Sequence, residues 1–243
     1  MTTGVDIHFK YGLKNEVIDL KNTDNQCDSL INSHNLTITS GAVGGVIDEF
    51  PIICGGRNLD GDAEQNCTIM KKERNIKFKM LEKRVDASCV LLNKTTLWIV
   101  GGTDLALSMH NSTEFIKVGH PPIKGPYLPF SIKNHCMVQI NESTIFIIGG
   151  YVNKQRNESS LNKEVSKKTW IIDSTKDFQV REGPSLNVFR SGHACSKFEI
   201  DGKYVVIVVG GYVSSNWLES VEILDMSSSL VWNFGNSYKD KIL

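Results

Sequence analysis

The sequence predicts an all-β protein built from repeated four-stranded antiparallel units. Four times along the chain an apolar strand ends in a glycine pair, and the pairs begin at residues 55, 101, 149 and 210. The repeat is therefore about 50 residues long, which is typical of arrays of four-stranded sheets. Each apolar strand is also preceded by another strand and a tight polar turn, so we expect almost no helix within 41–235.

Each glycine pair closes the second strand of a hairpin. The strands of the four hairpins are joined by Asp-Glu, Asn-Lys, Asn-Glu and Asp-Gly, and these residue types accept the dihedral angles of tight turns. The hairpins are expected at 44–56, 89–102, 136–150 and 195–211. Third strands are expected at 66–70, 112–116, 167–173 and 219–225, and fourth strands at 76–80, 118–124, 177–181 and 230–234.

These features resemble the kelch repeat. The residues that carry the resemblance are the glycine pairs, Glu114 and Glu222 in third strands, Trp232 in a fourth strand, and the linkers 125–140 and 183–200. The resemblance covers about 41–235 and implies a kelch-type β-propeller. Phe178 departs from the pattern, because it stands where a fourth-strand tryptophan is expected.

The resemblance implies four complete blades and part of another. The kelch repeats are expected over 41–243, with blades at about 41–81, 85–124, 133–182 and 190–235. Residues 1–40 are expected to hold a partial N-terminal blade, with strands at 15–20 and near 26–31, and an irregular segment. This is fewer blades than the family usually has, and an open ring exposes strand edges. We therefore expect an incomplete ring in a fragment of a longer protein, unless the partial blade finds its inner strands elsewhere.

The paired glycines are interpreted as packing residues. Inner strands of neighbouring blades crowd the axis of a propeller, and a residue without a Cβ lets backbones approach and turn there. A dinucleotide-binding loop would need a helix directly after the glycines, and none is expected. The eight residues are Gly55, Gly56, Gly101, Gly102, Gly149, Gly150, Gly210 and Gly211.

One face of such a propeller is expected to bind the partner. Because successive strands alternate in direction, the loops between second and third strands emerge together with the linkers between blades; we name this side the loop face. The turns between first and second strands emerge on the opposite side, the turn face. The loops at 57–65, 103–111, 151–166 and 212–219 vary in length, whereas the turns are short and alike. Variable loops on a constant scaffold are typical of binding proteins, so we expect a protein or peptide partner on the loop face.

Aromatic residues in these loops are the first binding candidates. Trp217 lies in a polar segment with no strand expected to bury it, and an exposed tryptophan is a common interface anchor. The alternative is that Trp217 folds back over the edge of its blade. Tyr151 and Tyr212 follow glycine pairs, where packing near the axis and lining a pocket are both compatible with the sequence.

Charged residues are the second group of candidates. Two loops carry Arg57, Asp60, Asp62, Lys154, Arg156 and Lys163. Charged loops are most often simply solvated, so Arg57 and Arg156 stand as candidates beside that alternative. Arg190, just before a first strand, is instead expected to pair with a carboxylate in the interior.

The sequence shows no catalytic or metal-binding constellation. The six histidines have no metal-ligand spacing, no serine lies in a nucleophile elbow, and no carboxylate pair stands out. His135 and His193 begin first strands, where a structural hydrogen bond is expected. Secreted copper enzymes of the galactose-oxidase type contain kelch repeats, but nothing here marks their tyrosine–cysteine crosslink or paired histidine ligands. We expect no cofactor, no metal and no enzymatic activity.

The cysteines and sequons bear on the compartment. The six cysteines contain no C-x-x-C pair, so no zinc site is expected. Cys54 ends a second strand and Cys67 opens the third strand of the same blade, so a disulfide between them is expected if the protein is extracellular. Sequons for N-glycosylation occur at Asn35, Asn66, Asn93, Asn111, Asn141 and Asn157.

Three roles stay open at this stage. An upstream signal peptide would make the chain an extracellular adhesion or ligand-binding module, and an upstream BTB domain would make it resemble the cytoplasmic substrate receptor of a ubiquitin ligase. An actin-associated scaffold fits kelch propellers equally well. Lys and Arg (27) balance Asp and Glu (27), so no nucleic-acid partner is expected. The longest apolar run, 204–213, is too short for a membrane span.

Overall fold

The chain is described by a computed structural model, and all of its regular elements are β-strands. The structure describes residues 16–17, 28–29, 39–71, 73–104, 108–153, 164–200, 202–214, 216–227 and 230–235. No residue in these ranges lies in a helix, as the sequence predicts. In the same ranges there is accordingly no helix long and apolar enough to cross a membrane.

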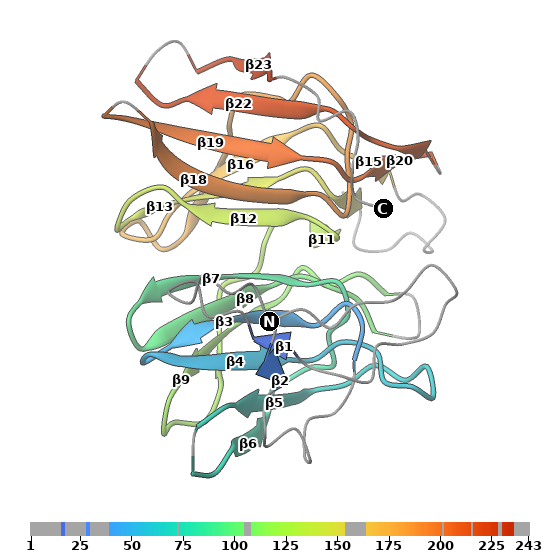
Figure 1. Cartoon of the computed structure of the whole chain (residues 1–243), viewed down its shortest axis with the longest axis vertical. Coiled ribbons are helices and arrows are strands. Elements are labelled where there is room, and N and C mark those ends of the chain that lie inside the picture. Colours follow the sequence, from blue (N-terminus) through green and yellow to red (C-terminus); the bar gives the residue numbers. More distant parts are fainter. Residues whose placement is uncertain are drawn as a thin grey trace.

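Four antiparallel sheets of four strands each make up most of the fold (Figure 1). Sheet 1 comprises β3 (Val43–Ile47), β4 (Phe50–Cys54), β5 (Asn66–Ile69) and β6 (Ile76–Lys79). Sheet 2 comprises β7 (Ser88–Asn93), β8 (Thr96–Val100), β9 (Thr113–Lys117) and β10 (Ile123–Lys124). Sheet 3 comprises β12 (Cys136–Gln139), β13 (Thr144–Ile148), β16 (Thr169–Asp173) and β17 (Gln179–Glu182). Sheet 4 comprises β18 (Ala194–Ile200), β19 (Lys203–Val209), β22 (Val221–Asp225) and β23 (Trp232–Phe234).

Three smaller sheets accompany them. Near the N-terminus, β1 (Glu16–Val17) pairs with β2 (Asp28–Ser29), within the segments where two strands of a partial blade are expected. A second small sheet is formed by β11 (Ser131–Lys133) of a linker with β14 (Tyr151–Asn153) and β15 (Glu164–Val165) of the loop in sheet 3. The third is a hairpin of β20 (Tyr212–Val213) and β21 (Asn216–Trp217) in the loop of sheet 4. The sequence analysis places these last segments in loops and a linker and predicts no strands there, because strand pairs this short leave no periodic pattern.

The fourth strands are shorter than the sequence predicts. In sheet 2 the expected strand at 118–124 is reduced to β10, after a turn that contains Gly119. In sheet 3, Asp177 and Phe178 have φ angles of 50° and 54°, so they belong to the preceding turn and β17 begins at Gln179. Residues with positive φ interrupt regular β-structure, so each of these two strands begins only after its turn.

The aromatic position of the fourth strand differs between sheets 3 and 4. Trp232 pairs with Leu224 in sheet 4, and Val180 takes the corresponding place opposite Ile172 in sheet 3. The alignment of Phe178 with that tryptophan is therefore wrong by two residues. The Phe178 ring packs instead on sheet 2, with its centroid 4.8 Å from that of Trp98.

Consecutive sheets pack face to face through their first strands and apolar faces. β3 contacts β7, β7 contacts β12, and β12 contacts β18, so the four sheets follow one another in chain order. In Figure 1, sheets 1 and 2 lie in the lower half and sheets 3 and 4 in the upper half. The three buried clusters between them centre on Ile52 and Ile99, on Trp98, Ile145 and Trp170, and on Phe146, Val206 and Leu224.

The glycine pairs of sheets 1, 2 and 3 lie where each sheet meets the linker that enters the next. The first glycine of each pair has a φ between 58° and 66°, and the second between 88° and 92°. At Gly101 an added Cβ would lie 2.3 Å from the carbonyl oxygen of Ile132, so no other residue fits without movement. The amide of Gly102 donates a 2.8 Å hydrogen bond to that same oxygen. Backbone contact between sheets therefore requires glycine at this position.

Two buried ion pairs tie linkers to third strands. Arg84 Nε donates to Glu114 Oε1 at 2.7 Å, and Arg190 Nη2 donates to Glu222 Oε1 at 2.7 Å. All four side chains are at most 1% exposed. The carboxylate partner expected for Arg190 is thus present.

The linker between sheets 2 and 3 has an apolar pair in the equivalent place. The carbonyl oxygens of Arg84, Ile132 and Arg190 each accept a hydrogen bond from the second glycine of the preceding sheet, which makes these three residues equivalent. Ile132 and Trp170 are both buried in the cluster between sheets 2 and 3. Sheet 3 therefore shows that this site of the repeat also accepts an apolar pair.

Candidate functional site

The described loop and linker residues of sheets 3 and 4 include the short strands β11, β14, β15, β20 and β21. β11, β15 and β20 lie at the right-hand ends of sheets 3 and 4 in Figure 1, and the β12–β13 and β18–β19 turns lie at the left. Loops and turns thus emerge on opposite sides of these sheets, as the alternation of strands predicts. The small strands hold the loop backbones in defined positions next to the glycine pairs.

Three aromatic side chains form a row on this face. The ring centroids of Tyr151 and Tyr212 are 6.1 Å apart, and those of Tyr212 and Trp217 are 5.8 Å apart. Trp217 is 82% exposed, more than any other large hydrophobic side chain in the described ranges. We refer to Tyr151, Tyr212 and Trp217 as the aromatic row.

The backbone fixes the centre of the row. Tyr212 exchanges backbone hydrogen bonds with Ser191 at 2.9 and 3.1 Å, which ties β20 to the linker that enters sheet 4. Its ring rests on Gly192, where an added Cβ would lie 2.7 Å from the ring. Burial raises the pKa of Tyr212 above its ordinary value, with a smaller contribution from Tyr151, so its hydroxyl stays protonated at neutral pH.

The β20–β21 hairpin sets the position of Trp217. Tyr212 pairs with Trp217 and Val213 pairs with Asn216, and Ser214 turns the chain with a φ of 47°. The Trp217 ring packs against the Tyr212 ring in a T-shaped arrangement and otherwise faces solvent. The alternative in which Trp217 folds back and is buried over its sheet is therefore wrong.

A charged pair lies at the other end of the row. Lys133 pairs in the backbone with Tyr151, and its Nζ lies 6.0 Å from the centroid of that ring. The same Nζ lies 3.6 Å from Asp86 Oδ2, which comes from the linker between sheets 1 and 2. The face thus joins an apolar end at Trp217 to a polar end at Asp86 and Lys133. Sequence reasoning missed this pair, because the two residues lie in different linkers.

The charged candidates fall elsewhere. Arg57 lies on the loop of sheet 1, where its backbone bridges to Ser40 and Ala63 and its side chain is exposed. The structure does not place Arg57 in the aromatic row. Arg156, Lys154 and Lys163 lie outside the described residues, as do the sequons at Asn35 and Asn157.

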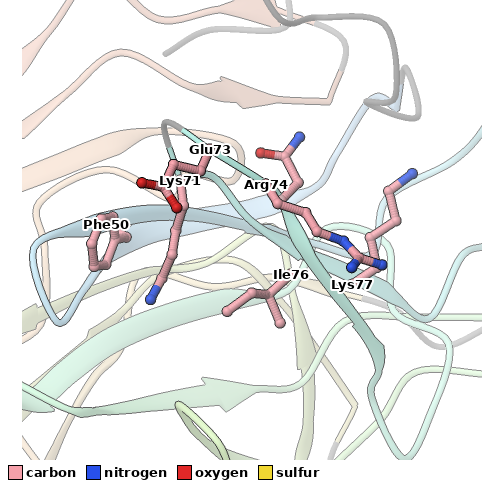
Figure 2. A pocket seen from close by; sticks show the side chains of 7 residues that line it. Phe50, Lys71, Glu73, Arg74, Ile76 and Lys77 are labelled. Atoms are coloured by element: carbon pink, nitrogen blue, oxygen red, sulfur yellow. The ribbon is translucent and has the colours of Figure 1, made fainter.

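A second candidate region is a hollow beside the outer hairpin of sheet 1, which consists of β5 and β6. It has a volume of about 690 Å³ and is lined by Phe50, Lys71, Glu73, Arg74, Asn75, Ile76 and Lys77 (Figure 2). The Nζ of Lys71 lies 4.3 Å from the centroid of the Phe50 ring, on the side of the hollow opposite Lys77 in the figure. The sequence analysis did not single out this region, although the cations crowded into residues 71–79 were a visible signal.

Two disulfides brace the sheets. Cys54 and Cys67, the pair expected from the sequence, are bonded across β4 and β5 with their Cα atoms 4.0 Å apart. Cys136 and Cys195 form a second disulfide between the first strands of sheets 3 and 4, with a Cα separation of 6.0 Å. The second pair was missed; each cysteine lies close behind a histidine at the start of a first strand, and that shared position was the available signal.

The buried titratable groups do not form a reactive site. Burial lowers the pKa of both His135 and His193 to about 3, so both rings are neutral at ordinary pH. The ring nitrogens of His135 have no hydrogen-bond partner in the described ranges, which contradicts the structural hydrogen bond expected there. Burial also raises the pKa of the Cys89 thiol to about 12, so it is not a thiolate nucleophile. Within the described parts of the chain, no three histidine, cysteine or acidic side chains converge as metal ligands.

Comparison with known proteins adds no relative. No protein-family model matches the sequence, and no curated protein matches it either. The case for function therefore rests on the residues themselves.

Proposed function

We propose that the chain is a non-enzymatic binding module, a kelch-type β-propeller that presents its loop face to a protein or peptide partner. The observation that carries the proposal is the aromatic row with Trp217 82% exposed at its end. Tryptophan and tyrosine are frequent anchors of interfaces.

The repeat supports the propeller. Four sheets of equal strand order follow one another through their first strands, and the glycine pairs of sheets 1, 2 and 3 meet the next linker at an equivalent contact. Arg84 with Glu114 and Arg190 with Glu222 repeat one buried arrangement in sheets 2 and 4. Repeated contacts of this kind between successive sheets support a radial array of like blades.

The rigidity of the row supports binding. Tyr151 and Tyr212 are held by backbone pairing to the linkers, so little conformational entropy is lost when a partner covers them. Trp217 offers a large apolar surface, and Asp86 and Lys133 offer polar groups at the opposite end. An extended peptide lying along the row would meet an apolar anchor first and charged groups after it.

The two disulfides favour the extracellular form of this role. Disulfides persist in oxidising compartments and are rare in the cytosol. An extracellular ligand-binding or adhesion module fits Cys54–Cys67 and Cys136–Cys195 better than a cytoplasmic ubiquitin-ligase receptor does.

Substitution of Trp217 tests the proposal. Peptides selected from a random display library on the wild-type protein are titrated by calorimetry against Trp217→Ala. We expect binding to weaken by about 2 kcal/mol, or roughly thirtyfold, as truncated interface anchors do.

The matched control is Tyr204→Ala, an aromatic residue that is 51% exposed in β19 near the turn face. The affinity of Tyr204→Ala for the selected peptides should be nearly unchanged, and so should that of Lys94→Ala in the β7–β8 turn. If only the control substitutions weakened binding, the assignment of the face would be wrong. If no peptide bound while the protein turned over a small molecule, the binding-module proposal itself would fail.

A further inference from the structure

Positive charge is concentrated on the outer hairpin of sheet 1. The protein has no net charge overall, yet Lys71, Arg74, Lys77 and Lys79 lie within nine residues of one another. Lys71 is half-buried and the other three are exposed. We name these four side chains the basic hairpin. Charges of one sign that gather on one surface raise the local concentration of oppositely charged ligands.

The basic hairpin is not neutralised by its surroundings. None of its four cations takes part in a salt bridge within the described ranges, where the lysines and arginines that do are Arg84, Lys133, Lys168, Lys176 and Arg190. Glu73 is the acidic side chain that lines the hollow, and it too makes no ion pair there. The cations are therefore available to an external anion.

Protection of a strand edge does not account for this charge. Lysines on an outermost strand prevent pairing with other chains, and β6 is the outermost strand of sheet 1. If edge protection were the cause, the other outermost strands should resemble β6. Instead β10 has one lysine, β17 has one arginine beside a glutamate, and β23 has no charged residue.

The hollow adds a shaped, partly apolar floor to the charge. Its volume of about 690 Å³ can hold a sugar unit or two, and Phe50 and Ile76 present carbon atoms to it. Ile76 is 39% exposed. Lys77 and Lys79 alternate with Ile76 and Phe78, so the two lysines leave the same side of the strand about 7 Å apart along its backbone. A polymer with regularly spaced anionic groups and carbon-rich ring faces matches both features.

We propose that the basic hairpin binds a sulfated polysaccharide. Two polyanions match the charge, a sulfated glycan and a nucleic acid. The disulfides Cys54–Cys67 and Cys136–Cys195 decide between them, because oxidising compartments outside the cytosol are where sulfated glycans occur. This site lies on sheet 1, apart from the aromatic row on sheets 3 and 4, and it does not depend on the proposed peptide partner.

Binding to heparin oligosaccharides tests the proposal. The wild-type protein and the variant Arg74→Gln/Lys77→Gln/Lys79→Gln are titrated with a heparin hexasaccharide at several salt concentrations. We expect the variant to bind at least tenfold more weakly and with a smaller salt dependence, because fewer counterions are released from the polyanion. Glu73→Gln should bind the hexasaccharide more tightly than wild type.

The matched control is Lys117→Gln/Arg181→Gln/Lys203→Gln, which removes two exposed lysines and one exposed arginine from sheets 2, 3 and 4. The control should keep wild-type affinity, and circular dichroism and melting curves should show both triple variants folded. Equal loss in both triple variants would mean general charge attraction and would overturn the site. Equal or tighter binding of single-stranded DNA to the hairpin would overturn the assignment to a sulfated glycan.

Discussion

Acidification should destabilise this protein through two buried histidines. His135 precedes β12 and His193 precedes β18, and they are 6% and 8% exposed. Loss of solvation is the main reason that the pKa of each falls to about 3; His193 contributes to the lowered pKa of His135, and Arg190 to that of His193. In the unfolded chain both rings regain a pKa of about 6.5.

The sign and size of the effect follow from these values. The folded state keeps both rings neutral, so their contribution to stability is complete above about pH 6.5 and is lost as the pH falls toward 3. Between pH 7.5 and pH 5.0, each histidine should cost about 2 kcal/mol of the free energy of unfolding, or about 4 kcal/mol together. That is a large fraction of the stability of a typical domain.

Urea unfolding at the two pH values measures this loss. The variant His135→Leu/His193→Leu keeps every carboxylate but lacks both titrating rings, so the difference between its pH dependence and that of the wild type isolates the histidines. We expect the wild type to lose about 4 kcal/mol more than the variant. Equal losses in the two proteins would show that the rings are protonated in the folded state, and the reasoning from burial would be refuted.

Two further substitutions test the packing of the repeat. Arg84→Met should lower the free energy of unfolding in urea by about 3–5 kcal/mol, because it leaves the Glu114 carboxylate buried without its arginine partner. The double variant Arg84→Met/Glu114→Leu should recover most of this loss, because sheet 3 holds an apolar pair in the equivalent place. A double variant no more stable than the single one would argue against this. Gly101→Ala should cost about 3 kcal/mol in thermal unfolding, because its φ is +65° and the new Cβ would meet a backbone oxygen at 2.3 Å. Gly61 has a φ of +89°, but a Cβ added there would meet no atom within 4 Å, so Gly61→Ala should cost only about 1–2 kcal/mol of stability. Similar losses of stability at both glycines would contradict a steric role for Gly101.

Local features of the chain could be predicted from the sequence. Glycine pairs after apolar strands, with Asn, Asp or Gly in the turns, predict hairpins because turn dihedrals and strand periodicity depend on neighbouring residues. The same reasoning singled out Cys54 with Cys67, which lie on strands joined by one short loop, and gave Arg190 its buried carboxylate. It could not find where the fourth strand of sheet 3 begins, because the positive φ at Phe178 has no signature in residue type.

Contacts between sheets were decided by the tertiary structure. Cys136 and Cys195 are 59 residues apart and meet only because β12 packs beside β18. Tyr151, Tyr212 and Trp217 likewise come from two loops, and no spacing in the sequence records that their rings lie about 6 Å apart. The strand pattern along the chain determines each sheet, but the angle and distance at which two sheets pack depend on side chains from both. The sequence by itself therefore determined the repeating sheets, and only their packing decided which side chains share a surface.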